Sequence, residues 1–236
     1  MIRGLLLLFL PFMAAADEVS IALHDGEIAK GHLHAGAADS PAVILFHQCN
    51  RTQAMWSPLV ALLREQGYST LTVDLRGYGE SATDDYDVLR DGYRISGINR
   101  ADDLDSFNAF WRETLPDASH RVVVGASCGG GMATQTVIQH GDIDGLVLFS
   151  PSLRRLADKY RARLDETADT PVLAITSIGD ENADASIELV FEPNRVERSR
   201  KLIYKGERHG EPLFEIDPAL PALMAGWIRE TIELTE

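Results

Sequence analysis

Short runs rich in apolar residues recur along this chain and are separated by stretches in which apolar residues follow a helical spacing. The run at residues 42–46 is continuously apolar, and the others occupy residues 69–73, 121–125, 145–149 and 171–176. Uninterrupted apolar runs of this length are typical of parallel strands that are buried on both faces. Helical spacing of apolar residues predicts the intervening and closing helices, at residues 56–65, 101–111, 128–140, 153–164 and 218–234.

Two further patterns complete the predicted sheet. Residues 19–23 and 28–34 flank a His-Asp-Gly turn, which predicts an antiparallel hairpin at the start of the fold. Residues 201–204 predict a last strand, whereas residues 187–195 are only weakly patterned. Because strands alternate with helices, we expect an α/β fold: one mostly parallel central sheet of about eight strands, with an antiparallel start and helices on both faces.

Residues 1–16 have the pattern of a secretory signal peptide. Arg3 precedes an apolar stretch at residues 4–12, and alanines at 14–16 offer a signal-peptidase site before Asp17. An uncleaved anchor or a buried strand is less favoured, because crossing a bilayer takes about 20 apolar residues. We predict cleavage after Ala16, a single domain at residues 17–236, and export to the periplasm or the medium without membrane insertion.

The charge of the chain narrows the range of partners. The sequence holds 22 basic and 36 acidic residues, a net charge of −14. A surface this acidic repels phosphate backbones and anionic lipid, which argues against nucleic-acid and membrane-surface roles. We expect a small-molecule substrate; the sequence does not indicate an oligomeric state.

A Gly-Ala-Ser-Cys-Gly motif at residues 125–129 is the strongest chemical signal. It lies directly after a predicted buried strand and directly before a predicted helix. A serine at such a turn adopts strained dihedral angles and needs small neighbours, and the helix N-terminus favours negative charge beside its oxygen. A glycine-rich packing turn is the alternative, but the strand–turn–helix context favours Ser127 as a nucleophile.

A serine nucleophile needs a base, and the base needs an acid that orients it. Asp180 follows the predicted strand at 171–176, and His209 follows the strand at 201–204. Both therefore lie at the carboxyl edge of the sheet, where open α/β sheets place their sites. The other histidines lie in the hairpin or flank elements elsewhere, and Glu181 is the rival to Asp180.

An acyl-transfer site also needs two backbone N–H groups for the oxyanion. The residue after the nucleophile, Cys128, supplies one, and the loop after the third strand supplies the other, for which Cys49 is the candidate.

Two segments carry a family resemblance. The Phe-His-Gln turn at residues 46–48 looks like the His-Gly turn of α/β-hydrolases, and the Asp-Leu-Arg-Gly-Tyr-Gly-Glu-Ser segment at 74–81 is similar to their D-x-R-G-x-G-x-S pattern. The likeness runs from about residue 40 to the C-terminus. Gln48 departs from the pattern because glycine is expected there, and its side chain could crowd the oxyanion hole. The segment at 74–81 has a structural interpretation, as a turn braced by an ion pair.

The resemblance also implies how the site is covered. Little more than one helix separates residues 149 and 171, where such enzymes often carry a lid, so we expect none. This compactness resembles the dienelactone-hydrolase-like branch, whose usual nucleophile is cysteine; because the motif here holds serine, lactone specificity is not carried over. The loop at 77–98 is the candidate cover, and we expect substrate contacts from Gln48, Trp56, Tyr86 and Tyr93.

The two cysteines, Cys49 and Cys128, are also the two candidate oxyanion donors. Two N–H groups that point at one oxyanion bring their Cα atoms near the 4.4–6.8 Å range, roughly, that a disulfide needs. Export permits oxidation. We therefore hypothesise a Cys49–Cys128 disulfide, with two buried thiols as the alternative.

These features favour a serine hydrolase that cleaves carboxylic esters through an acyl-enzyme, with Ser127, His209 and Asp180 as its triad. No cluster has the spacing of metal ligands, so no metal or cofactor is expected. A peptidase or thioesterase with the same triad, and a non-catalytic binding protein of the cell envelope, remain the alternatives.

Overall fold

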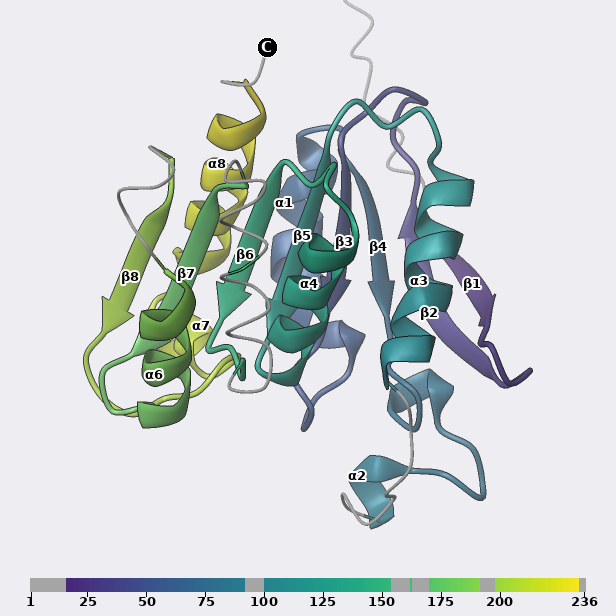
Figure 1. Cartoon of the computed structure of the whole chain (residues 1–236), viewed down its shortest axis with the longest axis horizontal. Coiled ribbons are helices and arrows are strands. Elements are labelled where there is room, and N and C mark those ends of the chain that lie inside the picture. Colours follow the sequence, from purple (N-terminus) through teal and green to yellow (C-terminus); the bar gives the residue numbers. More distant parts are fainter. Residues whose placement is uncertain (1–15, 92–99, 154–161, 163–169, 192–197, 234–236) are drawn as a thin grey trace, which may run out of the picture.

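The computed structural model describes residues 16–91, 100–153, 162, 170–191 and 198–233. Its centre is an eight-stranded sheet with the order β1-β2-β4-β3-β5-β6-β7-β8 (Figure 1). The first hairpin pairs antiparallel, and β2 pairs antiparallel with β4, whereas all later pairs are parallel. This confirms the predicted mostly parallel sheet with an antiparallel start. The strands are β1 (Asp17–Ala22), β2 (Ile28–His34), β3 (Ala42–Phe46), β4 (Ser69–Val73), β5 (Arg121–Ala126), β6 (Gly145–Phe149), β7 (Val172–Ser177) and β8 (Arg200–Tyr204).

Helices cover both faces of the sheet, as predicted. Apolar side chains of α3, α4 and α6 pack on one face, and those of α1, α7 and α8 pack on the other. The described helices are η1 (Gln53–Trp56), α1 (Ser57–Glu65), η2 (Gly79–Ser81), α2 (Val88–Asp91), α3 (Arg100–Thr114), α4 (Cys128–Gln139), α6 (Glu181–Val190), α7 (Leu213–Ile216) and α8 (Leu220–Glu233).

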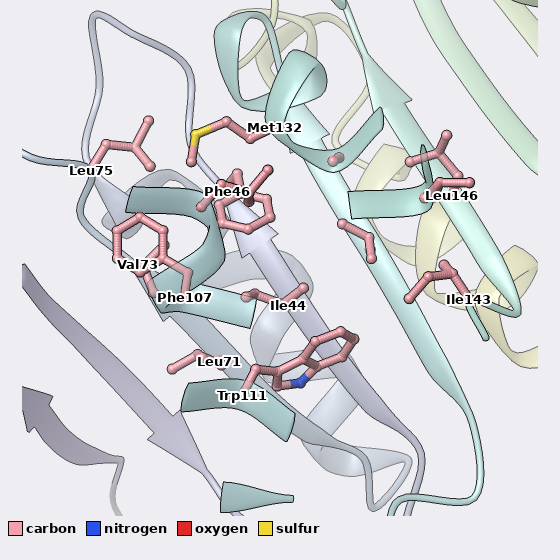
Figure 2. Packing of buried hydrophobic residues seen from close by; sticks show 14 of the residues in the cluster. Ile44, Phe46, Leu71, Val73, Leu75, Phe107, Trp111, Met132, Ile143 and Leu146 are labelled. Carbon is pink, nitrogen blue, oxygen red and sulfur yellow. The ribbon is translucent and has the colours of Figure 1, made fainter. Parts of the chain in front are cut away.

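Strand β3 shows why a continuous apolar run predicts a central strand. Its five residues are all buried. Successive side chains point to opposite faces of a sheet, so Ile44 and Phe46 join the core beneath α3 and α4, where they pack near Phe107 and Trp111 (Figure 2). Val43 and Leu45 join the core on the opposite face.

Most predicted elements are found within a residue or two of their expected ends. The short helices α2 and α7 were not predicted, and neither was the longer α6, which occupies Glu181–Val190, where the sequence suggested only a weak pattern from residue 187 onward. Ala183, Ser186 and Ile187 are its buried positions, and this helical spacing of small and apolar residues is the signal that could have identified it. Most of the helix expected at 153–164 lies outside the described residues, and so does the region expected to lack a lid.

The carboxyl ends of the parallel strands meet at one edge of the sheet, the lower edge in Figure 1. The loops after β3, β5, β7 and β8 all leave from this edge. The described part of the chain contains no helix with both the length and the apolar character of a membrane span. The predicted signal peptide falls almost entirely on residues outside those described.

Candidate active site

Ser127 occupies the turn between β5 and α4 in a backbone conformation that L-residues rarely adopt. Its φ is 52° and its ψ is −116°. Among the described residues, only Ser127 and Ser150 combine a side chain with a positive φ. Such conformations cost about 1–3 kcal/mol and concentrate at functional sites. The Ser127 N–H donates to the Phe149 carbonyl oxygen (2.9 Å), which holds the turn against β6. Its side chain makes no capping hydrogen bond to α4, so the hydroxyl is not committed to the helix.

Gly129 explains how α4 approaches the sheet so closely. A Cβ atom added at this position would lie 2.4 Å from the Phe46 carbonyl oxygen and 2.6 Å from that of His47. Only glycine fits against the end of β3 at this distance. The Gly-x-Ser-x-Gly spacing therefore brings the nucleophile turn into contact with the loop that follows β3.

His209 and Asp180, which lie on loops after β8 and β7, are joined by a hydrogen bond. His209 Nδ1 lies 2.6 Å from Asp180 Oδ2. The Asp180 side chain is 8% exposed and that of His209 is 38% exposed. The carboxylate is thus shielded from water, while the imidazole reaches the surface, as an orienting acid and a base require.

The rival Glu181 does not take the place of Asp180. Asp180 is the N-cap of α6, and its Oδ1 accepts the N–H of Ala183. Glu181 begins the helix and is exposed. The aspartate is therefore held by the helix through one oxygen and contacts His209 through the other.

Cys49 and Cys128 form a disulfide, with their Cα atoms 5.8 Å apart. The structure thus contains the hypothesised bridge. It joins the loop after β3 to the first residue of α4, whose N–H has no intrahelical acceptor. The bridge therefore fixes the two candidate oxyanion donors relative to each other.

His47 anchors the start of this loop. Its buried ring accepts the Leu75 N–H at Nε2 (2.9 Å), so Nδ1 carries the proton and donates to the Gln48 carbonyl oxygen (2.8 Å). The ring also lies edge-on to Tyr78, 5.0 Å between centroids. A fixed tautomer and a buried position make His47 a structural residue of the loop.

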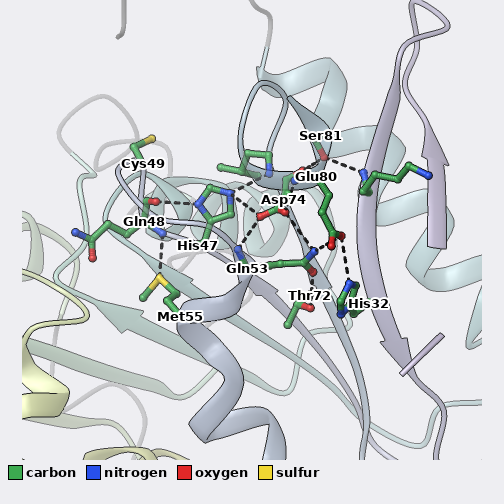
Figure 3. A network of polar contacts seen from close by, with 12 residues as sticks. His32, His47, Gln48, Cys49, Gln53, Met55, Thr72, Asp74, Glu80 and Ser81 are labelled. Atoms are coloured by element: carbon green, nitrogen blue, oxygen red, sulfur yellow. Dashed lines mark hydrogen bonds and ion pairs between the residues drawn. The ribbon is translucent and has the colours of Figure 1, made fainter. Parts of the chain in front are cut away.

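The segment at 74–81 is likewise structural, but its arginine forms ion pairs with residues outside the turn rather than within it. Asp74 is buried and accepts the N–H groups of Gln53 (2.7 Å) and Glu80 (2.9 Å) (Figure 3). Arg76 pairs instead with Asp103 and Asp25, and its hydrogen bonds lower the pKa of Asp25 to about 2. The segment is thus tied to α3 and to the first hairpin.

Three of the four predicted substrate contacts, Gln48, Trp56 and Tyr86, fall on described residues. Trp56 is a correction: it is fully buried in the core, 6.1 Å between ring centroids from Phe149, because η1 turns its side chain inward. Tyr86 is half-buried, and its ring packs over Gly77. Tyr93 lies outside the described residues. The Gln48 side chain is buried and extends away from His47 and the Asp74 network (Figure 3).

A cavity of about 280 Å³ lies elsewhere, between β2, β4 and the start of α1. Neither Ser127 nor His209 lines it. Glu80 accepts from Gln53 and contacts His32 there (Figure 3). Its lining residues are His32, His34, Thr52, Gln53, Ala54, Ser57, Val60, Thr72, Asp74, Gly79 and Glu80. In the part of the chain that the structure describes, no group of three His, Cys, Asp or Glu residues is placed to hold a metal ion.

Comparison with protein families supplies the identity of the fold. Residues 38–199 match the family described as serine aminopeptidase, S33. The chain belongs to this family. In this S33-family hydrolase the matched range includes Ser127 and Asp180 and ends before His209.

Solved structures share the fold of the hydrolase at low sequence identity. A carboxyl esterase from Bacillus coagulans superimposes with a TM-score of 0.71 at 13% identity, over 93% of this chain and 99% of that one. An esterase from Pyrococcus furiosus gives 0.66 at 16% identity, over 92% and 93%. A thioesterase domain from the curacin biosynthetic pathway gives 0.61 at 14% identity, over 89% and 99%. No curated protein sequence matches this chain. The predicted α/β-hydrolase fold is confirmed.

Removal of the disulfide from this hydrolase is expected to lower the free energy of unfolding by about 4 kcal/mol, because the bond closes a long loop in the unfolded chain. The two cysteines are 79 positions apart. Urea unfolding of the Cys49→Ser/Cys128→Ser variant against the wild type measures the loss. Reductant should destabilise the wild type alone, and two free thiols in denatured, unreduced protein would contradict the bridge.

Proposed function

We propose that this hydrolase cleaves carboxylic esters through an acyl-enzyme formed on Ser127. Ser127 Oγ attacks the ester carbonyl, and His209 Nε2 takes the hydroxyl proton and passes it to the leaving alcohol. Water then attacks the acyl group: His209 takes a proton from the water and returns it to Ser127 Oγ as the acid product leaves. The observation that carries the proposal is the His209–Asp180 hydrogen bond at the same sheet edge as a serine with a strained backbone.

Asp180 acts through His209. Its carboxylate accepts from Nδ1, which leaves Nε2 free to receive a proton and stabilises the imidazolium that forms. The N–H groups of Cys128 and Cys49 are the proposed oxyanion donors, held together by the disulfide. Each preorganised donor of this kind lowers the activation free energy by about 3–4 kcal/mol.

Peptide hydrolysis is the second candidate, since the matched family is described as a serine aminopeptidase. The thioesterase domain among the structural neighbours supports thioester cleavage in the same way. All of these reactions use the same nucleophile and base. Rates with p-nitrophenyl acetate, an acetyl thioester and amino-acid p-nitroanilides separate the three, and an anilide rate above the ester rate would favour the peptidase.

Labelling with a fluorophosphonate tests the proposed site directly. The native protein should take up one label per chain on Ser127, because the probe forms a stable adduct only with an activated serine. Peptide mapping by mass spectrometry locates the adduct, and heat-denatured protein serves as the control. An unlabelled native protein without ester turnover would instead support a non-catalytic binding protein.

We also propose that the hydrolase is exported, to the periplasm or the medium, after cleavage behind Ala16. The disulfide supports this, because such bonds persist in oxidising compartments. A mature N-terminus at Asp17 is the expected result of N-terminal sequencing, and a cytoplasmic protein that keeps Met1 would contradict it.

A further inference from the structure

Gln48 replaces the glycine expected in the oxyanion turn, and its side chain reaches the loop that carries His209. Its Oε1 accepts the N–H of Glu211 (3.2 Å), two residues after His209. Its Nε2 donates to Asn50 Oδ1 (2.6 Å), which fixes the orientation of the amide. The Gln48 side chain lies in a buried position, since the residue is 3% exposed. Buried side-chain amides in folded proteins almost always have hydrogen-bond partners, and these two contacts supply them for Gln48.

Arg51, in the same turn, contacts the same residue. Its guanidinium forms an ion pair with the Glu211 carboxylate. The Arg51 N–H donates to the Gln48 carbonyl oxygen (2.9 Å), which closes the turn at residues 48–51. The turn at 48–51 therefore binds both the backbone N–H and the side-chain carboxylate of Glu211.

Gly210 shows how closely the turn and the histidine loop fit. Its φ is +66°, and a Cβ atom there would lie 2.0 Å from Gln48 Oε1. A side chain at 210 would force the Gln48 amide to move from its present position. The His-Gly pair at 209–210 is thus shaped to receive the Gln48 amide.

The backbone on both sides of His209 is anchored by other side chains as well. Ser150 Oγ accepts the Gly210 N–H (2.9 Å), and Ser177 Oγ donates to the Arg208 carbonyl oxygen (2.6 Å). Both serines come from the ends of neighbouring strands, β6 and β7. Gln48 differs from them, because it comes from the turn whose next residue, Cys49, is bonded to Cys128.

We propose that Gln48 is a positioning residue that sets the place of His209 relative to Ser127 and the oxyanion donors. The connection runs from Ser127 through Cys128 and the disulfide to the turn at 48–51, and from Gln48 through Glu211 to His209. This inference rests on the proposed function, in which His209 serves Ser127. A displacement of about 1 Å between catalytic groups can cost about 10²-fold in rate.

Kinetics of Gln48→Met and Gln48→Glu test the proposal. Methionine fills the same volume without an acceptor for the Glu211 N–H, so kcat for p-nitrophenyl acetate should fall about tenfold with little change in KM. Glutamate keeps an acceptor oxygen at the same reach but loses the donor to Asn50, so its kcat should lie between those of Gln48→Met and the wild type. Equal kcat in Gln48→Met and the wild type would overturn the proposal. Gln139→Met, on the exposed end of α4, is the matched control.

Gln48→Gly separates positioning from crowding. If the glutamine crowds the oxyanion turn, glycine should raise kcat; if it holds the histidine loop, glycine should lower kcat as methionine does. A rise overturns the proposal. Because glycine adds no side chain to the buried site, Gln48→Gly still tests the proposal if Gln48→Met fails to fold. Circular dichroism shows whether each variant is folded.

Hydrogen exchange at the Glu211 amide gives a readout that needs no activity. Loss of its acceptor in Gln48→Met or Gln48→Gly should speed exchange at this amide, while amides in β5 stay protected. Unchanged exchange would overturn the link. A wild type without turnover would refute the proposed esterase, and the exchange result would still show whether Gln48 holds the loop.

Discussion

Replacing Ser127 with alanine is expected to lower kcat for p-nitrophenyl acetate by about 10⁵- to 10⁶-fold, to the rate left by the oxyanion donors and binding alone. Alanine removes the attacking oxygen and leaves the turn otherwise in place. The side chain makes no capping hydrogen bond to α4, so the fold should not depend on it. Steady-state kinetics and thermal unfolding of the two proteins measure the two effects.

The matched control for this substitution is Ser119→Ala. Ser119 is exposed in the loop before β5, at the edge of the sheet opposite Ser127. It should keep wild-type kinetics. Equal turnover by Ser127→Ala and the wild type would refute the acyl-enzyme at this residue.

Asp180→Asn should lower kcat by about 10⁴-fold, because an amide that donates to Nδ1 selects the wrong tautomer of His209. Asparagine is the informative replacement, since it caps helices as well as aspartate does. The cap on Ala183 is thereby kept, and a loss of rate reports on His209 rather than on α6. The pH dependence of kcat should change with it.

Glu181→Gln is the control for this prediction. It removes an adjacent carboxylate that is exposed and forms part of the first turn of α6. The rate should stay near that of the wild type. If Glu181→Gln lost activity and Asp180→Asn kept it, the orienting acid would be Glu181.

The strand pattern and the nucleophile turn could be read from the sequence because both are local. A strand buried on both faces is rich in apolar residues, as β3 and β6 are. A strained turn before a helix needs small residues around Ser127. The order of Asp180 and His209 after later strands then follows from the parallel sheet. Helix α6 was missed because its buried positions include serine and alanine, which weaken the apolar pattern.

Contacts between distant segments were decided by the tertiary structure. Gln48 looked like a substrate contact or an obstruction, yet its amide bonds to Glu211, 163 positions away. Trp56 looked like part of a pocket and is a core residue. Arg76 pairs with Asp25 and Asp103, which no spacing along the chain brings near it. A polar side chain finds its partner only after the sheet has aligned the loops at its edge, so the sequence supplied the chemical groups and the fold determined which of them meet.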